Sequence, residues 1–126
     1  MKKKVYYAHS MHLYDTKQEL RDIEILEKLG FKVINPNTPQ VQEGVEEYRK
    51  EFGAERVMEY FFDMVNEAEV FAFRAHPEGK IPSGVNWELN TAKGLNKLII
   101  ELPSLLSTRG LSVEDTKEYL KLLGQR

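Results

Sequence analysis

The sequence predicts an α/β fold: a three-layer, Rossmann-like (flavodoxin-like) sandwich around a four- to five-stranded, mainly parallel sheet. Short segments rich in β-branched and aromatic residues alternate with helical segments along the chain. The strand segments show little polar alternation, which is typical of a sheet covered by helices on both faces. The 126 residues fit one domain, residues 1–126. A chain of this length buries roughly two-thirds of its unfolded surface.

The first strand and the first helix have clear local signals. Residues 4–8 (KVYYA) are aromatic and β-branched, as expected of a strand. Residues 15–29 repeat leucine and isoleucine at helical spacing. Thr16 and Glu19 have the spacing of a capping box at the start of this helix. Gly30 can adopt the left-handed conformation that ends it.

The middle of the chain predicts two more strands with helices between them. Residues 31–35 (FKVIN) form a second strand, and residues 37–44 are loop-like in composition. A short charged helix is expected at 45–53, followed by an amphipathic helix at 54–67. Residues 69–74 (EVFAFR) then form the third strand.

The last third continues the alternation. Residues 75–82 contain two prolines and a glycine and are predicted to be a loop. A helix is expected at 83–95 with Ser83 as its N-cap. Residues 98–102 (LIIEL) form the fourth strand, and a capped helix at 112–123 follows.

The overall charge and the missing residue types exclude several classes of protein. Eighteen basic and 20 acidic residues give a net charge of −2, so we expect no binding to nucleic acid polymers or membranes. The apolar segment near the start is too short for a signal peptide or a membrane span. The absence of cysteine excludes disulfides, thiolate catalysis and zinc–thiolate sites. We therefore expect a cytoplasmic protein.

Common catalytic and cofactor motifs are also missing. The sequence contains no P-loop, no G-x-G-x-x-G and no G-x-S-x-G pattern. The three histidines lack the spacing of metal ligands on a helix. We expect neither a metal nor an organic cofactor.

The fold class predicts where a ligand-binding site would lie. In parallel α/β sheets, ligands bind at the carboxyl ends of the strands, near the point where strand order reverses. Three loops follow predicted strands there: 9–14, 35–40 and 74–84. The candidate substrate-binding residues in these loops and at the start of the next helix are His9, Ser10, Met11, Asn37, Ser83, Gly84 and Val85.

Glu88 is the candidate catalytic residue. Gly84 lets a ligand approach the backbone at a helix start, where free amides favour an anion. Glu88 follows about one turn later, beside Trp87. A partly desolvated carboxylate there can act as a nucleophile or base. The alternative is a solvated carboxylate that complements the helix dipole.

Two segments resemble a known superfamily. One comprises Val85-Asn86-Trp87-Glu88-Leu89, with Ala92, Lys97 and Ile99 after it. The other is Val5-Tyr6-Tyr7-Ala8-His9-Ser10-Met11. Together they resemble the nucleoside 2-deoxyribosyltransferase superfamily, which includes the 2′-deoxynucleoside 5′-phosphate N-hydrolases. The match in order and spacing extends over residues 5–102.

The resemblance implies roles for particular residues. It makes Glu88 the nucleophile that takes the sugar, with the Tyr6 hydroxyl close to it. An aspartate of the superfamily is expected on the helix before the third strand, but Phe61 holds that position. Asp63 is the nearest aspartate, and its helical phase places it on a solvated face. His9 stands where the superfamily has a loop glycine.

The implied function is cleavage or transfer at the N-glycosidic bond of a nucleoside or nucleoside monophosphate, with Ser10 and Ser83 sharing a phosphate. The alternative is a catalytically inactive nucleotide-binding or sensing module on the same fold, which the missing aspartate favours. A third alternative is an assembly protein without a ligand.

The resemblance also implies a homo-oligomer, a dimer or larger. The consecutive Tyr60, Phe61 and Phe62 exceed what one helix face can bury, which fits a subunit interface.

Overall fold

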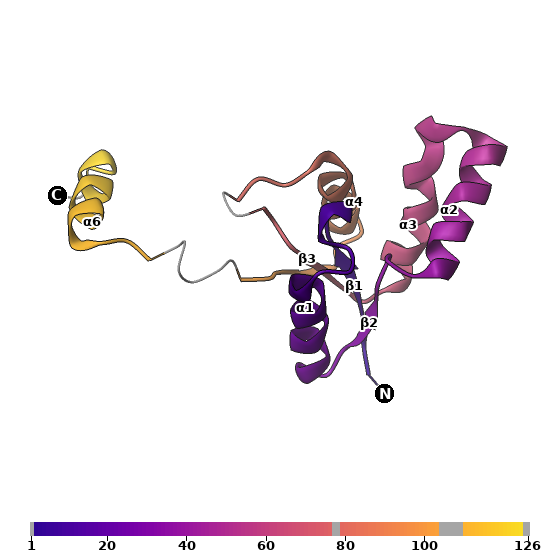
Figure 1. The fold of residues 1–126 in the computed structure, drawn as a ribbon, viewed down its shortest axis with the longest axis horizontal. Coiled ribbons are helices and arrows are strands. Elements are labelled where there is room, and N and C mark those ends of the chain that lie inside the picture. The colour runs from indigo at the N-terminus through magenta and orange to yellow at the C-terminus, as the bar shows by residue number, and fades with distance from the viewer. Residues whose placement is uncertain (1, 77–78, 104–109, 125–126) are drawn as a thin grey trace.

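Four parallel strands form one sheet in the computed structural model, which describes residues 2–76, 79–103 and 110–124 (Figure 1). The strands are β1 (Lys4–Ala8), β2 (Lys32–Ile34), β3 (Val70–Phe73) and β4 (Leu98–Glu101). Their order is β2-β1-β3-β4, and every neighbouring pair is parallel. This order matches the first four strands of the flavodoxin-like arrangement, so the predicted α/β fold class is confirmed.

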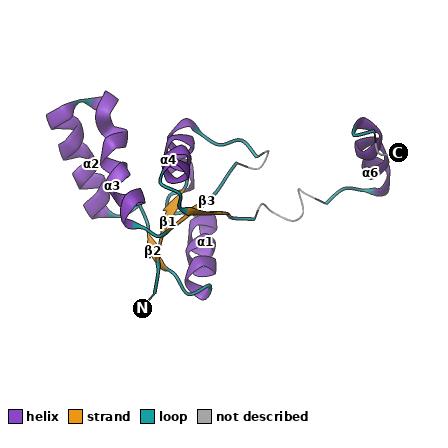
Figure 2. Cartoon of the chain, turned by 180° about the vertical axis from the view of Figure 1, so that it is seen from behind, coloured by secondary structure: helices purple, strands orange, loops and turns teal. Residues whose placement is uncertain are grey.

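Helices cover both faces of the sheet (Figures 1 and 2). Helix α1 packs on one face, while α3 and α4 pack on the other. The helical elements are η1 (Met11–Leu13), α1 (Lys17–Lys28), α2 (Pro39–Phe52), η2 (Ala54–Arg56), α3 (Val57–Glu67), α4 (Ser83–Gly94) and α6 (Val113–Leu122). In the part of the chain that the structure describes, no helix is long and apolar enough to cross a membrane.

The central strand β1 divides the core into two halves. Successive side chains of a strand point to opposite faces, so Tyr6 and Tyr7 belong to different halves. Tyr6 packs with residues of α3 and α4, including Val65 and Leu89. Tyr7 packs on the other face with Leu26 of α1. Both tyrosines are fully buried, which fixes β1 as the centre of the fold.

Helix α2 begins earlier than the sequence predicts. Residues 37–44 were expected to be a loop, but α2 starts at Pro39. Thr38 caps it by accepting a hydrogen bond from the Val41 amide, and a proline is well tolerated in the first turn. Gly44, which suggested a loop, lies inside the helix. A Cβ atom there would lie 2.7 Å from Cζ of Tyr60 and overlap its hydroxyl, so the glycine allows close packing of α2 against Tyr60.

Two helix starts differ from the prediction by smaller amounts. Pro82 occupies the N-cap position of α4, and Ser83 is the first helical residue, with no side-chain capping bond. The predicted helix at 54–67 opens with the 3₁₀ turn η2, so α3 itself begins at Val57. The caps at Thr16 and Ser112 are confirmed, because each hydroxyl accepts a hydrogen bond from an amide three residues later.

The packing at Gly44 gives a stability prediction. Alanine has the better helix propensity, but at position 44 its methyl group would overlap Tyr60. We expect Gly44→Ala to lower the free energy of unfolding by about 1–3 kcal/mol, as overpacking typically does. Gly94 of α4 has open space around its Cβ position, so Gly94→Ala is the matched control and should be neutral or slightly stabilising. Urea denaturation of both variants measures the difference, and equal stability would contradict the packing argument.

Candidate active site

A cavity of about 310 Å³ opens where β1 and β3 end, at the point where the strand order reverses. The segment after β1, the turn after β2, helix α3 and the start of α4 all contribute to it. Its lining residues are Tyr6, His9, Ser10, Met11, His12, Tyr14, Pro36, Met58, Phe61, Pro82, Gly84, Val85 and Glu88. The position predicted from the fold class is therefore occupied by a real cavity.

A buried carboxyl group lies at the base of this cavity. Glu88 is 7% exposed, and its Oε2 accepts a short hydrogen bond from the hydroxyl of Tyr6. Burial raises the pKa of Glu88 to about 7, although the hydrogen bond from Tyr6 acts in the opposite direction. Burial and the neighbouring Glu88 carboxylate raise the pKa of Tyr6 well above its ordinary value. With this pKa, Glu88 is partly ionised at neutral pH, and the ionised form is the one that can act as a nucleophile or a base.

Glu88 is not a solvated complement to the helix dipole. It lies beyond the first turn of α4, which contains no acidic residue. Its side chain points into the core side of the helix, where Val85, Leu89 and Ala92 are also buried. The dipole-complement alternative from the sequence is therefore wrong.

His9 is locked in place beside the cavity. Its ring stacks on Tyr7 with 3.8 Å between ring centroids. Its Nε2 lies 2.7 Å from Oε2 of the buried Glu19, and its Nδ1 lies 3.2 Å from the Tyr7 carbonyl oxygen. With both nitrogens engaged, His9 forms a rigid wall where the resembling superfamily has glycine.

Asn37 supports the first loop instead of lining the cavity. Its Nδ2 donates to carboxylate oxygens of Glu19 and Asp15 at 3.1 Å. The same Glu19 accepts from the Asp15 amide, so its carboxylate joins the helix start, His9 and the turn after β2. Pro36, adjacent to Asn37, is the residue of this turn that reaches the cavity.

The structure separates Asp63 from the site. Asp63 is exposed on α3, on the side toward Tyr48 of α2, whose pKa is raised mainly by its hydrogen bond to Glu59 and only slightly by Asp63. Phe61 lines the cavity instead. Two residues correspond to about 200° around a helix, so Asp63 points away from the cavity that Phe61 faces. Ser83 is also exposed and does not line the cavity, whereas Gly84 and Val85 do.

Sequence reasoning missed several lining residues. Met58 lies three residues before Phe61 on the same face of α3, so the helical spacing could have revealed it. Tyr14 lies at the end of the predicted loop 9–14. Burial, together with Glu88 and Glu19, raises the pKa of Tyr14 to about 12, so its hydroxyl stays protonated. His12, Pro36 and Pro82 also line the cavity; they lie within the predicted loops 9–14, 35–40 and 74–84 but were not singled out there.

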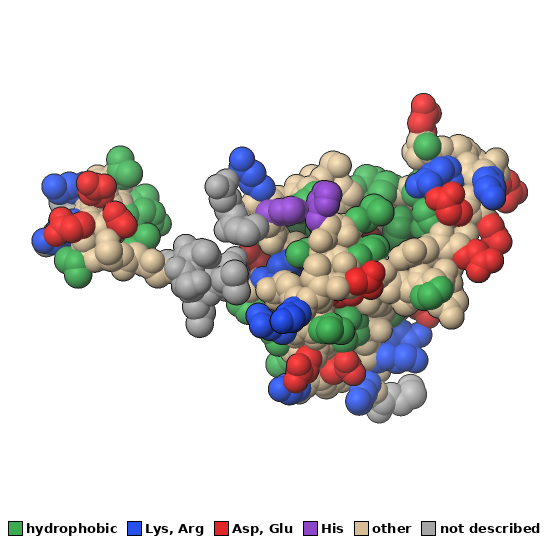
Figure 3. Space-filling view, viewed as in Figure 1, with side chains coloured by type: hydrophobic (Ala, Val, Ile, Leu, Met, Phe, Trp, Pro, Cys, Tyr) green, Lys and Arg blue, Asp and Glu red, His purple; other side chains and the backbone are tan. Residues whose placement is uncertain are grey.

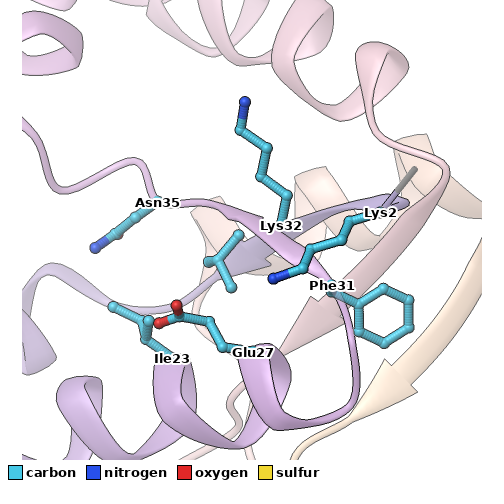
Figure 4. Close-up of a pocket in the computed structure, with 7 residues that line it drawn as sticks. Lys2, Ile23, Glu27, Phe31, Lys32 and Asn35 are labelled. Carbon is cyan, nitrogen blue, oxygen red and sulfur yellow. The ribbon is translucent and has the colours of Figure 1, made fainter.

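A second hollow of about 400 Å³ lies between α1 and β2 (Figure 4). Lys2, Glu27 and Lys32 lie around it together with apolar residues such as Phe31. Its charged side chains are all exposed, and no buried ionisable group converges on it. The smaller cavity, in contrast, has the buried carboxyl group of Glu88 in its lining. Among the described residues, no cluster of three or more His, Asp or Glu could hold a metal ion.

Comparison with known proteins supports the fold. No protein-family model matches the chain, and no curated protein matches it. Among solved structures, the chain is similar to the CMP N-glycosidase BcmB of Clostridium botulinum, with a TM-score of 0.50 and 20% identity. The superposition covers 98% of this chain and 100% of the other. The two proteins share a fold.

Burial of Glu88 makes the stability of the protein depend on pH. The folded state holds the Glu88 proton more tightly than the unfolded state, since the pKa rises from 4.5 to about 7. This contribution is complete below pH 4.5 and is lost as the pH rises through 7; by this shift it is worth up to roughly 3 kcal/mol. We expect Glu88→Gln to match the wild type at pH 4.5 and to be the more stable protein at pH 8.

Chemical denaturation at several pH values measures this difference. Glu47→Gln, at an exposed position of α2, is the matched control and should follow the wild type throughout. A constant difference between Glu88→Gln and the wild type from pH 4.5 to pH 8 would contradict the prediction.

Proposed function

We propose that this protein is an enzyme that cleaves or transfers at the N-glycosidic bond of a nucleoside or nucleoside monophosphate, with Glu88 as its nucleophile. The observation that carries the proposal is the buried Glu88 carboxyl, held by the Tyr6 hydroxyl at the base of a cavity large enough for a nucleoside. The sequence motifs around Glu88 and Tyr6 resemble the nucleoside 2-deoxyribosyltransferase superfamily. The similarity in fold to a CMP N-glycosidase supports the same class of reaction.

The proposed reaction is a double displacement. An ionised oxygen of Glu88 attacks the anomeric carbon of the sugar, and the carbon–nitrogen bond breaks as its electron pair leaves with the base. The base takes up a proton from water. In the second step a water molecule, or the nitrogen of a second base, attacks the same carbon and releases the Glu88 carboxylate. Tyr6 orients the carboxylate by donating a hydrogen bond to one oxygen.

The walls of the cavity suit the two ends of such a substrate. Met58, Phe61 and Pro36 offer an apolar surface to a planar base. Gly84, in the first turn of α4, brings free backbone amides to the cavity, and these favour a phosphate or a sugar hydroxyl. Ser10 also lines the cavity and adds a hydroxyl.

The second candidate is a nucleotide-binding or sensing module without turnover. Phe61 favours it, because this apolar side chain occupies the position at which the resembling superfamily carries an aspartate. The cavity and the amides of α4 would still bind a nucleotide. The two candidates differ in whether base is released from a bound ligand.

Base release tests the proposal directly. The protein is incubated with ribo- and deoxyribonucleosides and their 5′-monophosphates, including CMP, and free base is measured by chromatography. We expect release from at least one compound, a loss of 100-fold or more in kcat for Glu88→Gln, and a smaller loss for Tyr6→Phe. Glu47→Gln should keep full activity. A wild type that binds a nucleotide by calorimetry but releases no base would establish the binding module instead.

The pH dependence of the reaction provides a second test. Only ionised Glu88 can attack, and its pKa lies at about 7. We expect kcat/KM to increase about tenfold per pH unit below 7 and to level off above it, since this ratio reports ionisation of the free enzyme. Tyr6→Phe removes the hydrogen bond that lowers the pKa of Glu88, so its profile should shift to higher pH. A profile that is flat from pH 5.5 to 8.5 would exclude Glu88 as the titrating nucleophile.

A further inference from the structure

The hydroxyl of Tyr14 is a polar group of the cavity that the proposed reaction leaves unused. Tyr14 is half-buried and lines the cavity at the end of the loop after β1. Among the residues that the structure describes, its hydroxyl has no hydrogen-bond partner, whereas every fully enclosed side-chain nitrogen or oxygen has one. The Tyr14 hydroxyl is therefore open to the cavity and available to a ligand.

This hydroxyl lies beside the proposed nucleophile. Burial raises the pKa of Tyr14 to about 12, and the Glu88 carboxylate is the next cause. Burial and Glu88 also raise the pKa of Tyr6, and Tyr14 adds a smaller effect. The two phenols and the carboxyl group therefore share one end of the cavity. At neutral pH the Tyr14 hydroxyl keeps its proton, so it can donate one hydrogen bond and accept another.

The chain around Tyr14 is held from several sides. The Tyr14 amide donates to the carbonyl oxygen of Met11 at 3.1 Å and closes the turn η1. The Tyr14 ring lies against the ring of His9, with 5.0 Å between the centroids. Asp15 follows with a φ of 63°, a left-handed conformation that is uncommon outside glycine.

Hydrogen bonds maintain this conformation of Asp15. Its amide donates to Oε1 of Glu19 at 3.1 Å, and its Oδ1 accepts from Nδ2 of Asn37 at 3.1 Å. The Glu19 carboxylate also lies 2.7 Å from Nε2 of His9. These contacts fix the point from which the chain presents Tyr14. A preorganised hydroxyl favours specificity, because little freedom is lost when a ligand binds.

The apolar wall of the cavity comes from a different element. Hydrophobic side chains gather between the α2–α3 pair and the centre of the molecule (Figure 3). Met58 and Phe61 of α3 line the cavity. Tyr14 lies instead at the end of β1, next to His9. A nucleoside with its base against α3 would have its sugar near Glu88 and Tyr14.

The stereochemistry of the proposed reaction selects one group of that sugar. The nucleophile attacks the face of the sugar ring opposite the departing base. In a β-ribonucleoside the 2′-hydroxyl projects from this same face, on the carbon next to the anomeric carbon. The 3′-hydroxyl is on this face too, but one carbon further away. A hydroxyl beside Glu88 therefore meets the 2′-hydroxyl first.

We propose that the Tyr14 hydroxyl binds the 2′-hydroxyl of the sugar, so that the substrates of this site carry ribose and not 2′-deoxyribose. The inference rests on the proposed function, because the position of the sugar follows from Glu88 as the nucleophile. Tyr14 determines specificity by touching the substrate, and it takes no part in the transfer of electrons or protons. A site that hydrogen-bonds a substrate hydroxyl rejects the analogue that lacks it, since the polar group of the protein then loses its partner.

A double-mutant cycle between protein and substrate tests the contact. Wild type and Tyr14→Phe are assayed with adenosine and cytidine and with the 2′-deoxy and 3′-deoxy analogue of each. We expect the wild type to prefer ribose to 2′-deoxyribose in kcat/KM, and Tyr14→Phe to reduce this preference about tenfold, as the loss of one hydrogen bond predicts. The intrinsic effect of the 2′-hydroxyl on bond cleavage is the same for both proteins, so it cancels in the comparison.

Two controls show whether the effect is specific. The preference for ribose over the 3′-deoxy analogue should stay the same in Tyr14→Phe. Tyr48→Phe removes a hydroxyl that binds Glu59 and lies outside the cavity lining, so this variant should keep the preferences of the wild type. An equal preference for ribose over 2′-deoxyribose in wild type and Tyr14→Phe would overturn the inference. A wild type that prefers 2′-deoxyribose would overturn it as well.

The same cycle can be measured without turnover. In the Glu88→Gln background, calorimetry gives the affinities of the intact ligands, and adding Tyr14→Phe should again reduce the preference for ribose about tenfold. If the wild type releases no base but this coupling is present, the proposed reaction fails and the contact at Tyr14 stands. If base is released and the coupling is absent, the reaction stands and the contact at Tyr14 fails.

Discussion

Two consecutive tyrosines of the central strand each bind a buried carboxylate, on opposite faces of the sheet. The hydroxyl of Tyr6 donates to Glu88 of α4, and the hydroxyl of Tyr7 donates to Asp22 of α1 at 2.6 Å. Because strand side chains alternate, adjacent residues of β1 hold the two helix layers to the sheet. A buried hydroxyl and a buried carboxylate are costly without a partner, so each pair constrains where its helix can lie.

The two carboxylates differ in how their charge is balanced. Asp22 lies against the Arg74 guanidinium and also accepts from the amide of Gln18. It is enclosed and fully paired, as a structural ion pair must be. Glu88 faces a cavity, and the neutral hydroxyl of Tyr6 is its hydrogen-bond donor among the described residues. Burial without a compensating cation raises the pKa of a carboxyl group, and it brings the pKa of Glu88 to about 7.

The sequence predicted the features that depend on local pattern. Alternating strand and helix signals predicted the parallel sheet, and the position of Gly84 and Glu88 after the third strand predicted the cavity. Side-chain direction was harder to predict. Glu19 has the spacing of a capping box, yet its carboxylate binds His9 and Asn37. His9 lies in the loop after β1, and Asn37 lies in the turn after β2. These hydrogen bonds hold the Asn37 side chain away from the cavity. They join residues that are far apart in sequence, so no local sequence pattern predicts them.

Phe61 shows how one substitution changes the chemistry available to Glu88. A carboxylate in place of Phe61 would add a like charge to the cavity and raise the pKa of Glu88 further. Because Phe61 is uncharged, burial is the cause that raises the pKa of Glu88, and this pKa is about 7. A useful fraction of Glu88 is then ionised at neutral pH without help from a second acidic group. The same phenyl ring gives the cavity an apolar wall for a planar base. In the proposed reaction the departing base takes its proton from water, and selectivity for the base depends on stacking and shape.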